Sequence, residues 1–283
     1  MSSHPRALQF HGAHFGLLSL HHKASIIAPL LAERWQARLT NSTAFDTDTL
    51  GTFSGEVERR LTPVECALHK ARLALELTGA DFGLGSEGSF GASPWGIGTH
   101  NQELVACVPA KGDWAVVGGY AAPFAADEYR YGDTEAQQRF WQQLPAGQGV
   151  MAVASGHKAG RSIKAITTQA ELEAQLAAHF AEQIPADLRI TYDLRAHQSP
   201  QRRVHIARAA ENLFARLACV CPDCARPGFW PDQTETGLPC AACGTPTHSL
   251  IARIAQCAGC GYQQRTAVAE ALADPATCPW CNP

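Results

Sequence analysis

The chain has 283 residues, of which 46% are hydrophobic, so it can form one large domain with a substantial core and a smaller second domain. Its formal net charge is −3, and no domain is strongly basic, so charge does not favour nucleic acid or an anionic membrane as a partner. The longest apolar runs are too short to span a bilayer, and the N-terminus lacks the pattern of a signal peptide. We therefore expect a soluble cytoplasmic protein that binds neither nucleic acid nor membrane.

Short apolar runs alternate with helical patterns over residues 1–217, which predicts an α/β domain with a mixed sheet flanked by helices. A capping box of Thr168 and Glu171 marks the start of the third helix. The expected strands are 15–20, a strand within 81–91 that runs into a glycine-rich turn, 103–108, 114–120, 149–155 and 188–194. The expected helices are 25–39, 63–78, 168–184 and 200–217.

The second of these helices has the clearest boundaries. Thr62 and Glu65 form a capping box, Pro63 occupies the first turn, and Gly79 closes the helix. Its expected apolar face consists of Val64, Leu68, Ala71 and Leu75.

The C-terminal segment, 218–283, contains four CxxC motifs. The two-residue spacing lets both thiolates of a tight turn face one tetrahedral ion, so the sequence predicts a tandem zinc-ribbon module with two structural Zn²⁺ ions. Redox-active dithiols are the alternative reading of such pairs. The predicted zinc ligands are Cys221, Cys224, Cys240, Cys243, Cys257, Cys260, Cys278 and Cys281.

The spacing leaves the pairing of the motifs open. The simplest arrangement joins the first motif with the second and the third with the fourth, as two successive ribbons. A crossed arrangement, in which the first motif joins the third, satisfies the same spacing. Cys219 and His248 are spare donors that we expect to be bystanders.

The charge of this segment bears on its partners. Only Arg226, Arg253 and Arg265 are basic, against five acidic residues, and eight thiolates with two Zn²⁺ ions add a net charge of −4. Phosphate binding by nucleic-acid-binding proteins rests on Lys and Arg, so we expect a structural or protein-contact role instead.

Carboxylates gather in "FDTDTLGTFSGEVERR", which contains Asp46, Asp48, Glu56 and Glu58. Such a segment is either a solvated loop or a source of oxygen ligands for a hard cation such as Mg²⁺. We expect Asp46, Asp48 and Glu56 to converge with Glu87, from "GSEGSFG", on one cation; the alternative for Glu87 is a solvated acid in a turn.

Basic residues near helix starts supply candidate phosphate contacts. Lys23 lies between a strand and a helix N-terminus, where α/β proteins hold phosphates. Arg195 and His197 precede the last helix of the domain, and Arg202 and Arg203 lie in its first turn, where a nearby anion would offset their conflict with the helix dipole. Each of these residues also fits a plain surface role.

Residues 15–105 resemble the inosine-triphosphate-type nucleotide pyrophosphatases, a similarity carried by the helix "TPVECALHKARLALELTG" and the turn "LSLHHK". The resemblance implies phosphate-binding roles for Lys23 and Lys70 and places Glu87 where that family has metal-binding acids. The family's first-turn asparagine is missing, and Ser86 and Glu87 replace its paired aspartates.

The whole chain is also similar to an uncharacterised bacterial domain-of-unknown-function family, through "DTDTLGTFSGE", "SEGSFG" and the CxxC-rich end.

Together these features suggest that the α/β domain binds a phosphorylated small molecule, such as a nucleotide, with a divalent cation. Metal ligands and a catalytic base would come from Asp46, Asp48, Glu56 and Glu87, and substrate contacts from Lys23, Lys70, Arg195 and His197. As an enzyme, the protein would hydrolyse a phosphoanhydride. The alternative is a non-catalytic adaptor whose zinc ribbons contact another protein.

Overall fold

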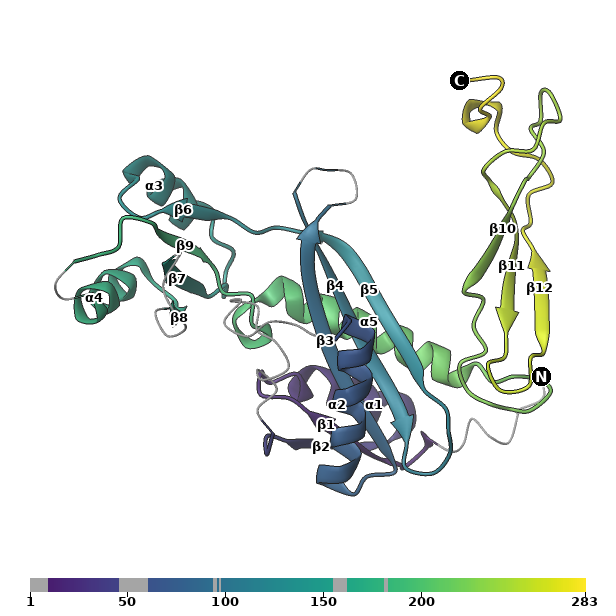
Figure 1. Ribbon diagram of the computed structural model, residues 1–283, viewed down its shortest axis with the longest axis horizontal. Coiled ribbons are helices and arrows are strands. Elements are labelled where there is room, and N and C mark those ends of the chain that lie inside the picture. Colours follow the sequence, from purple (N-terminus) through teal and green to yellow (C-terminus); the bar gives the residue numbers. More distant parts are fainter. Residues whose placement is uncertain (1–9, 46–60, 94–95, 97, 155–161, 181–182) are drawn as a thin grey trace. The chain divides into compact units, whose positions relative to one another are not determined.

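The structure is a computed structural model that describes residues 10–45, 61–93, 96, 98–154, 162–180 and 183–283 (Figure 1). The chain divides into two compact units, Phe10–Leu213 and a C-terminal unit that begins at Phe214. Among the described residues, the first unit contains two sheets and the second contains one. The predicted fold class is confirmed, whereas the predicted boundary between residues 217 and 218 stays a prediction.

The first sheet is mixed and has the strand order β2-β1-β3-β4-β5. Strand β1 is parallel to both of its neighbours, whereas β4 is antiparallel to both of its own. The strands are β1 (His14–Leu18), β2 (Arg38–Ser42), β3 (Phe82–Ala92), β4 (Thr99–Pro109) and β5 (Val116–Phe124). Since β3 and β5 both run antiparallel to β4, the carboxyl ends of β1, β3 and β5 lie at one edge of the sheet.

Helices cover both faces of this sheet. The chain steps from β1 to β2 through α1 (Ala24–Trp35) and returns past β1 to β3 through α2 (Pro63–Thr78). Because right-handed crossovers in opposite directions place their helices on opposite faces, α1 and α2 lie on different sides of the sheet. Helix α5 (Pro200–Ala218) starts beside the end of β5, where the backbone N–H of Ala125 donates to Gln201 Oε1.

Two glycines set the spacing between α2 and β3. A Cβ atom at Gly83 or Gly85 would collide with the backbone oxygen of Ala71 or Ala67, respectively. The helix therefore lies closer to the strand than any other residue would allow. Helix and strand run antiparallel, so the N-terminal turn of α2 lies beside the later part of β3.

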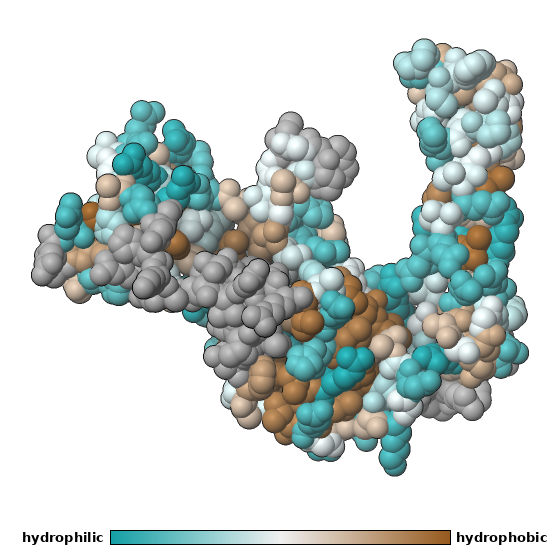
Figure 2. Space-filling view, viewed as in Figure 1, coloured by the Kyte–Doolittle hydropathy of each residue, from teal (hydrophilic) through white to brown (hydrophobic). Residues whose placement is uncertain are grey.

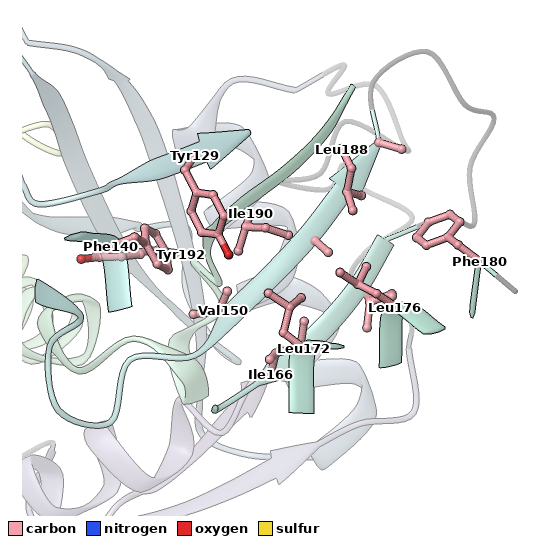
Figure 3. Packing of buried hydrophobic residues seen from close by; sticks show 13 residues of the cluster. Tyr129, Phe140, Val150, Ile166, Leu172, Leu176, Phe180, Leu188, Ile190 and Tyr192 are labelled. Carbon is pink, nitrogen blue, oxygen red and sulfur yellow. The ribbon is translucent and has the colours of Figure 1, made fainter. Parts of the chain in front are cut away.

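The second sheet is antiparallel, with the order β6-β9-β7-β8, and the sequence reading does not separate it from the first. Its own core includes Phe140, Ile166, Leu172, Leu176 and Ile190 (Figure 3). Its elements are β6 (Glu128–Arg130), α3 (Thr134–Gln143), β7 (Val150–Ala154), β8 (Ser162–Ile166), α4 (Gln169–His179) and β9 (Leu188–Tyr192). A short 3-10 helix, Ala196–Gln198, then leads into α5.

The C-terminal unit contains an antiparallel three-stranded sheet, with β11 in the centre. Its strands are β10 (Gln233–Thr236), β11 (Leu250–Gln256) and β12 (Gln263–Ala267), and a 3-10 helix, Pro275–Thr277, precedes the last CxxC motif.

Helix α2 confirms the predicted boundaries. The Thr62 hydroxyl accepts from the backbone N–H of Glu65, the Glu65 carboxylate accepts from the backbone N–H of Thr62, and Gly79 closes the helix with a left-handed backbone. The predicted apolar face is wrong at Val64, whose side chain is 43% exposed. Figure 2 shows apolar surface over the part of the α/β domain that contains α2.

Two other predicted elements need correction. The helix expected over 25–39 ends at Trp35, because Gln36 takes a left-handed backbone with φ of 52°, and the following residues form β2. The glycine-rich turn expected after 81 is absent, because β3 pairs with β4 without interruption from Phe82 to Ala92. No helix among the described residues is long and apolar enough to cross a membrane.

Candidate metal centres and buried charge clusters

The eight CxxC cysteines form two tetrads that could hold zinc. One contains Cys221, Cys224, Cys257 and Cys260, the other contains Cys240, Cys243, Cys278 and Cys281, and within each the ligand atoms lie within 4.8 Å of one another. Between motifs, the closest sulfur pairs are 3.5 and 3.7 Å apart in the first tetrad and 3.7 and 3.9 Å apart in the second. A tetrahedral ion with Zn–S bonds of about 2.3 Å requires sulfurs about 3.8 Å apart, so both tetrads fit Zn²⁺.

This arrangement is the crossed one, so the simpler pairing of successive motifs is wrong. One strand lies between each motif and the next: β10 after the first, β11 after the second and β12 after the third. Because these strands are antiparallel neighbours, each carries the chain from one end of the sheet to the other. The first and third motifs therefore meet at one end and the second and fourth at the other.

Hydrogen bonds shift thiol pKa values within the second tetrad in both directions. The side chain and backbone of Thr245 hydrogen-bond to Cys243 and lower the pKa of its thiol to about 6, which favours the thiolate form that binds metals. The hydrogen bond with Cys243 raises the pKa of the Cys281 thiol to about 12. Cys219 and His248 belong to neither tetrad, as expected.

The α/β domain collects buried charged residues at the carboxyl edge of its first sheet. Lys23, at the N-cap of α1, donates from Nζ to the backbone oxygen and the hydroxyl of Ser86 on β3, at 3.2 and 3.1 Å. Lys23 is only 6% exposed, so the alternative of a surface lysine at this position is wrong. Among the described residues, its ammonium forms hydrogen bonds only with Ser86.

The pKa of Lys23 reflects this environment. Burial is the largest cause that lowers it, and the nearby positive charge of Arg202 lowers it further, to about 8. The carboxylates of Glu103 and Glu87 act in the opposite direction, but not strongly enough to offset burial. The folded protein therefore holds an ammonium that its own acids do not fully compensate.

A second cluster lies on the α2 side of β3. Lys70 Nζ donates to Glu87 Oε2 at 2.5 Å, and the Cys66 thiol lies 3.5 Å from the same oxygen. All three residues are buried. Glu87 is thus neither a solvated acid nor a turn residue, and its closest described cation is a lysine ammonium.

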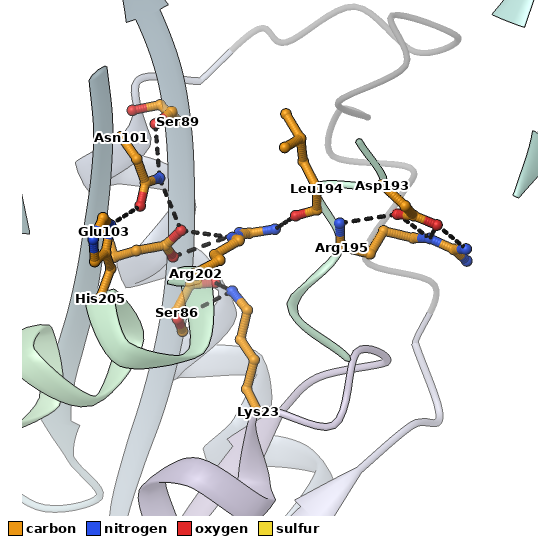
Figure 4. A network of polar contacts seen from close by, with 10 residues as sticks. All are labelled: Lys23, Ser86, Ser89, Asn101, Glu103, Asp193, Leu194, Arg195, Arg202 and His205. Atoms are coloured by element: carbon orange, nitrogen blue, oxygen red, sulfur yellow. Dashed lines mark hydrogen bonds and ion pairs between the residues drawn. The ribbon is translucent and has the colours of Figure 1, made fainter. Parts of the chain in front are cut away.

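A third cluster links β4 to α5 (Figure 4). Arg202 donates from Nε to Glu103 Oε1 at 2.6 Å and from Nη1 to the backbone oxygen of Leu194 at 2.6 Å. Asn101 donates to Glu103 at 3.1 Å, and its Oδ1 lies 2.7 Å from His205 Nδ1. The anion that compensates Arg202 at the start of α5 is therefore Glu103, which sequence reasoning missed because it begins an apolar strand pattern.

The predicted substrate contacts Arg195 and His197 lie before α5. Arg195 is paired with Asp193, through a 2.5 Å bond from Nη2 to Oδ2. Burial alone would raise the pKa of Asp193, but hydrogen bonds from Arg195 lower it below its usual value. The ring of His197 lies 5.5 Å from that of His21, and its buried Nδ1 has no hydrogen-bond partner in the part of the chain that the structure describes.

The remaining predicted acids, Asp46, Asp48 and Glu56, lie outside the described residues. Their convergence with Glu87 on one cation stays a prediction.

Among the described residues, the chain combines a mixed α/β domain with a small module whose two cysteine tetrads could hold zinc. The chain belongs to the DUF6671 family, a domain of unknown function whose model matches residues 70–283, from the middle of α2 to the end of the second tetrad. No curated protein and no solved structure matches the chain. Nothing in these comparisons supports the resemblance to nucleotide pyrophosphatases.

Proposed function

We propose that the α/β domain binds a phosphorylated small molecule at the carboxyl edge of its first sheet, beside Lys23. The observation that carries this proposal is the buried ammonium of Lys23, which hydrogen-bonds to Ser86 but has no carboxylate bound to it among the described residues. A buried ammonium whose charge is only partly compensated destabilises a folded domain, and an anion bound beside it would relieve that cost.

The position of Lys23 supports the proposal. Ligands of open α/β sheets bind outside the carboxyl ends of the strands, where neighbouring crossovers leave in opposite directions. Here that point lies between β1 and β3. From β1 the chain passes through α1 to β2, on one side of β1, and then through α2 to β3, on the other side of β1. Lys23 and Ser86 lie at this point.

Helix N-termini add to the positive potential at the same edge. Helix α1 starts beside Ser86 on one face of the sheet, α2 starts beside Glu87 on the other face, and α5 starts beyond the end of β5, at Ala125. The N-terminus of a helix carries about half a positive charge, which favours anions. The buried oxygen of Ser199, at the start of α5, has no hydrogen-bond partner among the described residues and adds a free polar group.

Isothermal titration of the zinc-loaded protein with pyrophosphate and with ATP, each with and without Mg²⁺, tests the proposal. We expect saturable binding that weakens at least tenfold in Lys23→Met and is unchanged in Lys111→Met. Lys111 is an exposed lysine between β4 and β5, at the opposite edge of the sheet. Absence of binding to both probes, or equal binding by Lys23→Met, would refute the proposal.

A second arm addresses catalysis and the predicted divalent cation. If the bound ligand is a phosphoanhydride that the protein hydrolyses, ATP incubated with protein and Mg²⁺ should release phosphate or pyrophosphate, and Lys23→Met should release neither. Binding without release assigns the domain a binding function only.

The zinc module supports a second candidate function as a protein adaptor. Trp280, within the fourth CxxC motif, is 78% exposed, and Leu272 is 53% exposed. Aromatic side chains at this exposure are common anchors of protein interfaces, and the acidic charge of the module favours a basic partner. Crosslinking in cells followed by reconstitution with the purified partner tests this role, which predicts loss of the complex in Trp280→Ala.

A further inference from the structure

We propose that Cys66, Glu87 and Lys70 form a nucleophilic site for acyl transfer, with an ester or amide as the substrate class. This site lies on the α2 side of β3 and differs from the Lys23 site in residues and in chemistry. It does not depend on the binding of a phosphorylated ligand.

The three side chains are brought together by one helix and one strand. Cys66 and Lys70 are four residues apart on α2, which places them on the same face of the helix. That face packs on β3, and Glu87 projects toward it, so that Glu87 Oε2 contacts both Cys66 Sγ, at 3.5 Å, and Lys70 Nζ, at 2.5 Å. A nucleophile, a base and a cation thus share one contact.

The contact has the chemical requirements for an activated thiol. A thiol is a weak nucleophile until it loses its proton, and a carboxylate within hydrogen-bonding distance can accept that proton. Lys70 completes the contact as an ion pair with Glu87, at the same carboxylate oxygen that the Cys66 thiol contacts. Cys66 also lies near the N-terminus of α2, where the helix carries a partial positive charge.

The other buried thiol of the domain provides a contrast. Cys107, on β4, is fully buried, and burial raises its pKa far above the usual value for a thiol. Burial is the sole cause of that shift, so Cys107 gains no activation from a neighbouring group. The two cysteines therefore differ in polar surroundings rather than in residue type or burial.

The reaction balances with water as the sole co-reactant. The Cys66 thiol gives its proton to Glu87, and the sulfur attacks the acyl carbon, forming a C–S bond. The bond from the acyl carbon to the leaving alcohol or amine breaks, and the leaving group takes the proton from Glu87. Water then attacks the thioester, with Glu87 accepting one of its protons, which releases the carboxylic acid and returns the proton to the sulfur.

Two reagents test the site on the zinc-loaded wild-type chain at pH 7. With iodoacetamide, peptide mapping should show alkylation of Cys66 at least tenfold faster than that of Cys107. With p-nitrophenyl acetate, we expect a burst of one p-nitrophenolate per chain and one acetyl group, mapped to Cys66. Equal alkylation rates for Cys66 and Cys107, or acetylation elsewhere only, would overturn the proposal.

Variants distinguish activation of the Cys66 thiol from its accessibility to the reagents. Glu87→Gln should slow alkylation of Cys66 at least tenfold while the partly exposed Cys219 reacts at the wild-type rate, and Cys66→Ser should abolish the burst. Cys107→Ser should leave the burst unchanged. If Glu87→Gln unfolds the domain, rapid alkylation of Cys107 will reveal the unfolding. The comparison of Cys66 with Cys107 in the wild type then tests the proposal. An unchanged Cys66 rate in folded Glu87→Gln means that Glu87 has only a structural role, and the proposal fails.

Discussion

Lys23 and Ser86, separated by 63 positions in the chain, are joined by two hydrogen bonds from one buried ammonium. Lys23 is the N-cap of α1 and Ser86 lies within β3, so the contact links the start of a helix to a strand. Strand β3 lies beside β1, on the side opposite to β2. Because the surroundings of the Lys23 ammonium do not fully compensate its charge, loss of that charge should stabilise the folded protein and weaken anion binding.

Lys23→Met should stabilise the ligand-free protein. The pKa of Lys23 falls from 10.5 to about 8 in the folded state, so its charged form destabilises folding, by on the order of 3 kcal/mol below pH 8. This cost is fully present at pH 7 and disappears as the pH rises from 8 to 10.5. Urea unfolding should therefore show the variant more stable at pH 7, by a margin that shrinks toward pH 10.5. A less stable variant at pH 7 would show that the ammonium contributes to folding.

Anion affinity should fall as the pH rises through 8. At pH 9 about a tenth of Lys23 retains its proton, so affinity for pyrophosphate should fall about tenfold relative to pH 7. Pyrophosphate itself gains negative charge over this range, which would strengthen binding, so a fall must come from the protein. Titration calorimetry at both pH values measures it. A flat profile would contradict a role for the Lys23 ammonium.

The Glu87–Lys70 pair should show strong coupling. Glu87→Leu or Lys70→Met alone leaves one buried charge without its partner and should cost about 3 kcal/mol of unfolding free energy. The double variant Lys70→Met/Glu87→Leu removes both charges and should lie within about 1 kcal/mol of the wild type. Urea unfolding of the four proteins completes the cycle. Additive effects would mean that the two side chains do not interact in solution.

Zinc content of paired cysteine variants should reveal the crossed arrangement. Cys221→Ser with Cys257→Ser damages a single tetrad and should leave about one Zn²⁺ per chain, whereas Cys221→Ser with Cys240→Ser damages both and should leave none. Pairing of successive motifs would reverse these two results. Metal analysis of protein purified without chelator distinguishes them, with two Zn²⁺ expected for the wild type.

Chelation provides the matching stability measurement. Coordination supplies folding energy to a small module, so removing zinc should unfold the segment after about residue 219 and leave the α/β domain folded. Hydrogen exchange should lose protection in β10, β11 and β12 alone. Loss of protection in β1 and β3 as well would show that the two units do not fold independently.

Local signals in the sequence predicted the ends of α2 and the eight cysteines of the two tetrads. Thr62, Glu65 and Gly79 act on backbone groups within one helical turn of themselves, so the ends of α2 could be predicted. The CxxC spacing likewise brings two thiols together within a single turn. The glycines of β3 misled the prediction, because Gly83 and Gly85 serve a close approach of α2 rather than a turn.

Tertiary structure alone decided which distant groups meet. The pairing of the cysteine motifs follows from the antiparallel path of β10, β11 and β12, which the 13 to 17 residues between motifs do not reveal. In the same way, Lys23 meets Ser86, and Glu103 meets Arg202, only after strand order has been set. Sequence patterns report interactions over a few residues, whereas contacts between distant residues depend on how strands pair and on which face each helix covers.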